Sequence, residues 1–252
     1  MPSPIRQAGE LLWRSAYTVA LTGAGISTPS GIPDFRSPQS GLWSRSDPLE
    51  VASLWAFHER PEDFYAWIRP LFRTMVTAQP NTAHRVLAEM EARRCLSAII
   101  TQNIDSLHQR AGNQHVLELH GHIRTASCLA CRTVFSSESL WPQLLAGAPP
   151  RCPECGAVLK PDVILFGEPL PYEVLRAAQQ EALACEVMLI VGTSLEVMPA
   201  ADLPLLARRH GARLIMINRT PTALDDQVDL IIRDDVSRAL LAVWQAWQAG
   251  AR

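Results

Sequence analysis

Five short apolar runs are spaced along the chain, and a polar segment follows each of the first four. The runs occupy residues 17–21, 97–101, 186–192, 212–218 and 228–232. They are continuous rather than alternating, which is typical of parallel strands that are covered on both faces. The patterns between them are helical, over residues 81–94, 171–185, 200–211 and 235–247. This order predicts a doubly wound α/β fold with a parallel, Rossmann-like sheet.

The alternation of strand and helix does not extend over the whole chain. We expect residues 1–35, 81–120 and 161–252 to form one Rossmann-like domain. Residues 36–80 are rich in Trp, Phe and Pro and are predicted to form a helical module or lid, whereas residues 121–160 are predicted to form a zinc-binding insert. Ligands of α/β folds bind at the carboxyl ends of the strands, so we expect the polar segments there to meet in one crevice.

Composition limits the class of protein. Of the 252 residues, 48% are hydrophobic, which is enough for a sizeable core, and the net charge is −2. Because there is no basic excess, we expect no direct binding to nucleic acid. We find neither a secretory signal nor an apolar run of about 20 residues, which predicts a cytoplasmic protein that does not enter a membrane. Only Lys160 among the 23 basic residues is a lysine, so the surface offers almost no amine for acylation.

Four of the six cysteines form two C-x-x-C pairs, Cys128 with Cys131 and Cys152 with Cys155. Four thiolates without a carboxylate or imidazole at matching spacing predict a closed tetrahedral zinc site. A closed site has no open position for water, so we expect this zinc to be structural. The alternatives are disulfides or a redox pair, and a cytoplasmic chain disfavours disulfides.

Two donor-rich turns follow predicted strands. Gly23 and Gly25 resemble a phosphate-binding turn, although Thr28 stands where the usual dinucleotide pattern has a third glycine. Residues 192–194, Gly-Thr-Ser, form the second turn, and Asn218 follows the next strand, where its amide can bond to ribose hydroxyls. No acidic residue stands at a strand end about 20 residues beyond the glycines. We therefore expect a nucleotide to be held differently from that in hydride-transfer dehydrogenases.

Further polar segments follow the second strand and flank the zinc insert. Residues 101–105, TQNID, offer amides and a carboxylate, which could also be the start of a helix with Asn103 or Asp105 as its N-cap. His120 and His122 flank a glycine, and the neutral imidazole of either could act as a general base. Spacing alone does not choose between them. Residues 160–168 could pair with an incoming peptide as an added strand, or they could be a simple connector.

Together these segments resemble the sirtuin family of NAD-dependent protein lysine deacylases. The resemblance runs from residue 23 to residue 219 through the segments GAGIS, GIPDFRS, TQNID, ELHG, the two C-x-x-C pairs, FGE, GTS and INR, in the order of the family. It implies NAD as co-substrate, one structural Zn²⁺ per chain, and acyl-lysine proteins or peptides as substrates. The implied reaction transfers the acyl group to ADP-ribose and releases nicotinamide.

The resemblance also implies roles for individual residues. It makes His120 the general base, which settles the choice against His122, and it places Asn103 beside it in catalysis. Phe35 would lie on a flexible cofactor loop and shield the reactive carbon after nicotinamide has left. The residues implied to hold NAD are Gly23, Ala24, Gly25, Ser27, Ile32, Pro33, Asp34, Phe35, Arg36, Gln102, Asn103, Ile104, Asp105, Gly192, Thr193, Ser194, Asn218, Arg219, Asp235 and Val236.

The residues implied to contact the acyl-lysine are Tyr65, Ile68, Ile164, Phe166, Gly167 and Glu168. Sirtuins that prefer negatively charged acyl groups carry a Tyr and an Arg three positions apart in the helical module. Here Ile68 occupies the Arg position, and Arg69 lies about 100° further around a helix. A succinyl carboxylate would lack its charge-assisted partner. We therefore expect an apolar pocket for acetyl and longer acyl chains.

Two other functions fit the same residues. A mono-ADP-ribosyltransferase would use the same NAD site, but a protein nucleophile would reach the ribose carbon in place of the acyl oxygen. A non-catalytic binding module would use the zinc ribbon to hold DNA or another partner. The lack of a basic excess speaks against the nucleic-acid version of the second function.

Overall fold

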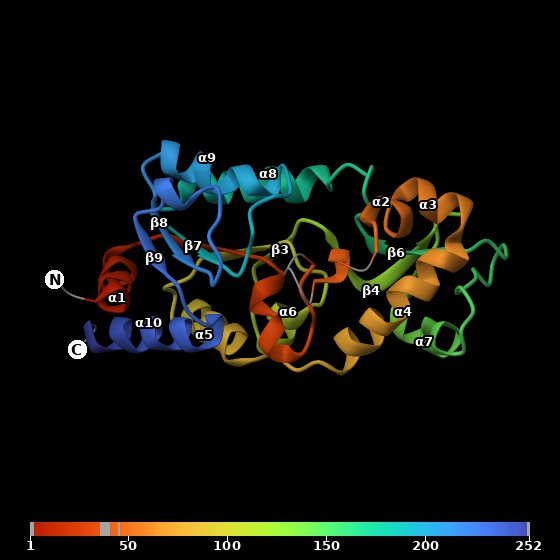
Figure 1. Ribbon diagram of the computed structural model, residues 1–252, viewed down its shortest axis with the longest axis horizontal. Coiled ribbons are helices and arrows are strands. Elements are labelled where there is room, and N and C mark those ends of the chain that lie inside the picture. Colours follow the sequence, from red (N-terminus) through yellow and green to blue (C-terminus); the bar gives the residue numbers. More distant parts are fainter. Residues whose placement is uncertain (1–2, 36–40, 45, 251–252) are drawn as a thin grey trace.

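The computed structural model describes residues 3–35, 41–44 and 46–250. Its main sheet has six parallel strands in the order β3-β2-β1-β7-β8-β9 (Figure 1). The strands are β1 (Thr18–Thr22), β2 (Ala98–Thr101), β3 (Val116–Glu118), β7 (Val187–Val191), β8 (Arg213–Ile217) and β9 (Leu230–Ile232). The strand order reverses between β1 and β7, and the crevice at such a reversal is where ligands of this fold bind.

Helices cover both faces of the main sheet. They are α1 (Pro4–Arg14), α5 (Thr82–Ala92), α6 (Leu107–Ala111), α8 (Tyr172–Ala184), α9 (Leu203–Arg209) and α10 (Val236–Gly250). In Figure 1, α8 and α9 lie on one side of the strands, and α1, α5 and α10 on the other. Along β7, Met188 and Ile190 pack on the α8 side, whereas Leu189 and Val191 pack on the α10 side. Burial on both faces explains the continuous apolar runs and confirms the predicted doubly wound fold.

The predicted elements differ from the observed ones mainly at their ends. The pattern over residues 200–211 predicted one helix, but the chain first forms a 3-10 turn. The α-helix α9 then starts at Leu203, which places Pro204 in the first turn, where its missing N–H costs no hydrogen bond. The short 3-10 turns are Ala24–Ile26 (η1), Thr28–Ser30 (η2), Leu42–Ser44 (η3), Ala200–Asp202 (η4) and Asp225–Gln227 (η5).

A second, smaller sheet carries the cysteine pairs. Its central strand β4 (Gly121–Cys128) pairs antiparallel with β5 (Val134–Ser136) and β6 (Leu159–Val163). The helices beside it are α2 (Pro48–Val51), α3 (Leu54–Glu59), α4 (Pro61–Thr77) and α7 (Ser137–Leu145), at the end of the molecule away from both termini (Figure 1). Strand β6 continues to Val163, past the predicted end of the insert at residue 160. The division of the chain into domains stays a prediction.

No helix in the described part of the chain combines the length and apolar character needed to cross a bilayer.

The small sheet and the helical module share one hydrophobic core. Phe64 and Ile68 of α4 pack in one cluster with Val163 and Leu165, which end and follow β6. The segment that leaves the small sheet is therefore fixed against α4.

Candidate active site and metal centre

Two interlocking glycine turns join the carboxyl ends of β1 and β7. The Gly25 N–H donates to the Gly192 carbonyl at 2.8 Å, and the Gly23 N–H donates to the Val191 carbonyl at 3.1 Å. Gly192 has a φ of +62°, and a Cβ there would lie 2.4 Å from the Ile26 nitrogen. Only glycine fits this crossing. The glycines thus let the turns pack closely. The N–H groups of Gly23 and Gly25 are both used in hydrogen bonds within the protein.

A cavity of about 750 Å³ opens from these turns, a volume typical of ligand sites. Its lining includes most of the predicted site residues, namely Gly23, Ala24, Gly25, Asp34, Phe35, Ile68, Gln102, Asn103, Ile104, His120, Ile164, Phe166, Gly167, Glu168, Gly192, Thr193, Ser194, Asn218, Arg219, Asp235 and Val236. One cavity therefore joins the predicted nucleotide end to the predicted acyl end.

The structure separates the two candidate histidines. His120 lines the main cavity, whereas His122 lines a second cavity. The His120 Nδ1 lies 2.9 Å from the Gln102 carbonyl oxygen. A carbonyl only accepts, so Nδ1 carries the proton of the neutral ring and Nε2 is its basic nitrogen. The main chain thus selects the tautomer that a general base needs.

Asn103 is buried and its amide is oriented by two acceptors. The Asn103 Nδ2 donates to the Gly23 carbonyl and to the Ser27 hydroxyl, each at 3.1 Å. Both amide hydrogens are therefore used within the protein. Because Asn103 also lines the cavity, the acceptor Oδ1 is the group it offers to a ligand.

Ser27 and Asp105 lie behind Asn103 and do not line the cavity. The Ser27 hydroxyl donates to the Asp105 carboxylate at 2.6 Å, and the Leu107 N–H donates to the other carboxylate oxygen at 2.9 Å. Burial raises the pKa of Asp105, and the hydrogen bond from Ser27 opposes that rise. The N-cap of α6 is Ser106, which corrects the expectation of Asn103 or Asp105 at that position.

Further predicted residues also lie outside the lining. Ile32 is buried in the core shared with α4, and Pro33 precedes the lining residues of its segment. Tyr65 is 2% exposed, and its hydroxyl donates to the Leu159 carbonyl, so it supports β6 instead of facing an acyl group. Burial raises the pKa of Tyr65. Arg36 lies outside the described residues.

Three aromatic side chains, Phe35, Trp43 and Trp67, form a row in the cavity lining, and the two tryptophans were not predicted as site residues. Phe35 and Trp43 have ring centroids 5.1 Å apart, and Trp43 stacks on Trp67 at 5.5 Å. The Trp43 N–H also donates to the Phe35 carbonyl at 3.0 Å. The abundance of aromatic residues in 36–80 was the only signal for this row. The other lining residues missed are Thr28, Ala52, Phe64, Leu71, Val163, Leu165, Leu170, Glu196, Val197, Met198, Thr220 and Pro221.

The far end of the cavity, near β8, is held by an arginine that the sequence did not single out. The Arg233 guanidinium donates to the Asn218 carbonyl at 3.1 Å and to the Thr220 carbonyl at 2.9 Å, and it pairs with Asp225. Hydrogen bonding to Arg233 lowers the pKa of Asp225. Arg219 and Asp235, which line the cavity here, form an ion pair at 2.5 Å.

Two histidines without a sequence motif prove to be buried together. The rings of His84 and His108 have centroids 4.9 Å apart, and the His108 Nε2 lies 3.0 Å from the Thr22 hydroxyl. Burial lowers the pKa of His84 to about 4 and places that of His108 well below its ordinary value. Both rings are therefore neutral at pH 7.

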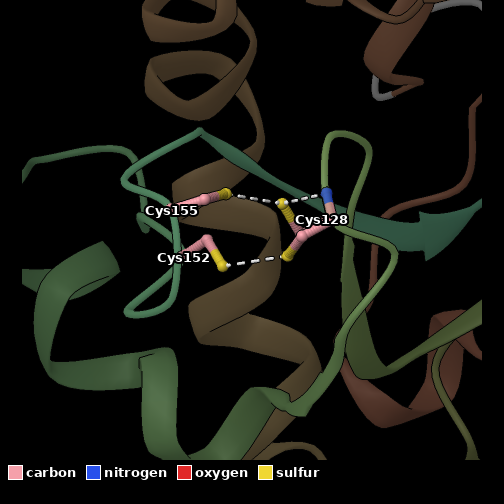
Figure 2. A group of neighbouring side chains, drawn as sticks. Cys128, Cys152 and Cys155 are labelled. Carbon is pink, nitrogen blue, oxygen red and sulfur yellow. Dashed lines mark hydrogen bonds between the residues drawn. The ribbon is translucent and has the colours of Figure 1, made fainter.

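The four predicted metal ligands are brought together between two turns of the small sheet. Their sulfur atoms all lie within 4.8 Å of one another, and Figure 2 shows those of Cys128, Cys152 and Cys155 turned toward a common centre. The sulfur of Cys128 is 3.4 Å from that of Cys155, close to the separation of about 3.8 Å that zinc–sulfur bonds of 2.3 Å give in a tetrahedron. None of these cysteines forms a disulfide. The donor set fits a structural zinc ion.

Comparison with known proteins gives consistent matches. The model of the Sir2 family matches residues 23–199. A protein of Caldivirga maquilingensis named NAD-dependent protein deacetylase is 47% identical over 236 residues, covering 93% of this chain and 90% of that protein. A solved structure described as "Structural Basis for the Mechanism and Regulation of Sir2 Enzymes" has a TM-score of 0.93 at 42% identity and covers 99% of both chains. Another, of a Sir2 variant with a deacetylated p53 peptide and 3′-O-acetyl-ADP-ribose, has a TM-score of 0.92 at 38% identity, covering 96% of this chain and 97% of that chain.

Proposed function

Because this chain belongs to the Sir2 family, we propose that it is an NAD-dependent protein lysine deacylase. It transfers the acyl group of an acyl-lysine to ADP-ribose and releases nicotinamide. The observation that carries this proposal is the placement of His120, with a basic Nε2, in a cavity that joins the glycine turns to an apolar end. A relative named NAD-dependent protein deacetylase and a neighbour solved with an acetylated ADP-ribose support it.

The residues around the cavity fit NAD as co-substrate. Thr193, Ser194 and Asn218 offer polar groups at the ends of β7 and β8, where this fold places nucleotides. When bound, NAD supplies the glycosidic bond whose cleavage drives acyl transfer. The structural zinc would be held away from this chemistry, by four cysteines that do not line the cavity, namely Cys128, Cys131, Cys152 and Cys155.

His120 removes a proton from a ribose hydroxyl through Nε2, because Nδ1 is protonated and bound to Gln102. Asn103 accepts a hydrogen bond through Oδ1. It thereby orients a ribose hydroxyl or the incoming acyl-lysine. Phe35, packed on Trp43, closes the nicotinamide end and keeps water from the reactive carbon. Ser27 and Asp105 hold Asn103 in place from behind.

The acyl pocket takes apolar groups in preference to succinyl. Phe64, Ile68 and Leu71 of α4 line this end of the cavity with Leu165 and Phe166. Among the described lining residues, the one guanidinium belongs to Arg219, which lies at the nucleotide end beside Asp235.

Arg69 is the residue that could be mistaken for a partner of a succinyl carboxylate. It does not line the cavity, and its guanidinium donates to the Gly147 carbonyl at 2.6 Å. A succinyl carboxylate in the acyl pocket would therefore be buried without a charged partner, which is costly.

One assay tests the proposed function. The protein is incubated with an acetyl-lysine peptide and NAD, and the products are followed by mass spectrometry. A deacylase produces nicotinamide, deacetylated peptide and O-acetyl-ADP-ribose together. ADP-ribosylated protein without deacetylated peptide would instead identify a transferase, and no product at all would indicate a binding module.

Location in the cytoplasm and lack of nucleic-acid binding stay predictions from the sequence.

A further inference from the structure

The only lysine of the chain is buried and fully hydrogen-bonded. Lys160 is 6% exposed, and its ammonium donates to the Val163 carbonyl at 2.7 Å, to the Pro161 carbonyl at 3.3 Å and to the Glu168 carboxylate at 2.9 Å. An ammonium has three N–H donors, so all are used. Burying such a charge is costly unless it is paired and hydrogen-bonded, and this site meets both conditions.

The partner of Lys160 closes a turn in the wall of the main cavity. The Glu168 carboxylate accepts the Leu165 N–H at 2.7 Å, and the Glu168 N–H donates to the Leu165 carbonyl at 3.0 Å. Gly167, with a φ of +89°, occupies the position where a type II turn requires glycine. The carboxylate of Glu168 is therefore directed into the turn and toward Lys160.

The other side of the same segment is held by the helical module. The Phe166 N–H donates to the Ala52 carbonyl, and the Leu54 N–H donates to the Phe166 carbonyl, each at 2.9 Å. The Phe166 backbone is thus already paired, which corrects the expectation that it is free to pair with a peptide. All residues from Val163 to Glu168 line the main cavity, so these contacts fix the path of its wall.

Lys160 itself lies outside the main cavity. It lines the second cavity, of about 540 Å³, whereas Val163, Ile164 and Glu168 line both cavities. The ion pair between Lys160 and Glu168 therefore lies at the partition between the two cavities. A ligand in the main cavity can meet the partition, but it cannot meet the lysine that holds it.

We propose that Lys160 is a positioning residue for the acyl-lysine substrate. By neutralising Glu168 and binding the Val163 carbonyl, it holds residues 163–168 in the shape that receives the acyl-lysine. This inference rests on the proposed deacylase function. It predicts an effect on peptide binding that is separate from any effect on NAD binding, because the partition does not contain the glycine turns or Asn218.

The test compares Lys160→Met, Lys160→Arg and a surface control, Arg213→Met, which removes an exposed arginine paired with Asp229 at the start of β8. KM is measured separately for the acetyl-lysine peptide and for NAD, and peptide affinity is measured by calorimetry. We expect Lys160→Met to raise the peptide KM about tenfold, with kcat and the NAD KM within about twofold of wild type. Lys160→Arg, which keeps the charge opposite Glu168, should recover most of the loss, and Arg213→Met should change neither KM.

An unchanged peptide KM in Lys160→Met, or a parallel rise in the NAD KM, would overturn the inference. If Lys160→Met does not fold, Lys160→Gln, which removes the charge but keeps a donor and leaves Glu168 intact, must raise the peptide KM. If the wild-type protein neither binds nor deacylates the peptide, the proposed function fails. Wild-type activity with no effect of either Lys160 variant rejects the positioning role alone.

Discussion

The His120 Nδ1 and the Gln102 carbonyl oxygen are 2.9 Å apart, and this contact decides which nitrogen of the ring is basic. The consequence is a prediction about catalysis. His120→Ala should lower kcat by about 10² to 10⁴, the usual contribution of a general base. Binding of NAD, measured by calorimetry, should remain within a few-fold of wild type because the glycine turns are untouched.

His122→Ala is the matched control, because His122 lies two residues away but lines the other cavity. It should retain near-normal kcat. Equal losses in the two variants would mean that the histidines act through the fold rather than through proton transfer.

Exchange of one residue should change the acyl preference. Ile68 is 3% exposed and lines the cavity at the end proposed to receive the acyl group. Ile68→Arg should raise the ratio of desuccinylation to deacetylation, since a guanidinium there gives a succinyl carboxylate its partner. Ile68→Met keeps the site apolar and should leave the ratio unchanged. If the arginine variant gives the same ratio as wild type, the account of the acyl pocket is wrong.

The stability of the fold should decrease as the pH is lowered, because of the buried histidine pair. The pKa of His84 is about 4 in the folded chain, below the value near 6.5 expected after unfolding. The stabilisation that the neutral His84 ring contributes to the folded state is therefore present above pH 6.5, and it is lost as the pH falls toward 4. The expected loss in unfolding free energy from pH 7 to pH 4 is on the order of 3 kcal/mol for His84 alone. Urea unfolding at a series of pH values measures it.

The comparison of histidine variants isolates this effect from the titration of carboxylates. His84→Gln should flatten the pH dependence, whereas His210→Gln, at an exposed position, should leave it as in wild type. A pH dependence that is identical in all three proteins would show that His84 does not titrate below its unfolded value.

Removal of the metal should destabilise the small sheet and also residues 163–168, which form the cavity wall that follows β6. The purified protein should contain one zinc per chain by elemental analysis. Cys152→Ser, which removes a buried thiolate, should lower zinc content and the melting temperature together. Peptide KM should rise as well, because β6 leads directly into the wall at Val163. A variant without zinc but with normal melting and normal peptide KM would contradict this role.

The enzyme should resist chemical acylation of its own lysine. The Lys160 side chain is buried and its amine nitrogen is bonded to three oxygens, so an acyl donor cannot reach it in the folded protein. Treatment of the native protein with acetyl phosphate should leave Lys160 unmodified in peptide mass spectra. Treatment after unfolding in urea should modify it. Equal modification in both states would show that the ion pair opens readily.

The sequence predicted the fold well where burial leaves a strong pattern. Val187–Val191 is buried on both faces, and such a strand needs a continuous apolar run. β3 was missed because its three residues are partly exposed and end in Glu118, so they do not form a continuous apolar run. β9 is equally short and lies at the opposite edge, but its residues Leu230–Ile232 are all apolar and were predicted.

The sequence predicted which segments form the candidate site, but not which of their side chains line the cavity and which lie behind it. Sequence order cannot show that Ser27 and Asp105 lie behind Asn103, because the depth of a side chain depends on packing between distant segments. Tyr65 and Ile68 are three residues apart on α4, yet one faces β6 and the other the cavity. Only the packing of α4 against the small sheet determines this rotation.

The fate of the acyl group tests the central claim most directly. In a timed reaction with acetyl-lysine peptide and NAD, O-acetyl-ADP-ribose and deacetylated peptide should form in a ratio of one to one, and both should disappear in His120→Ala. Nicotinamide release without deacetylated peptide, or deacetylated peptide with free acetate as the first product, would contradict the account.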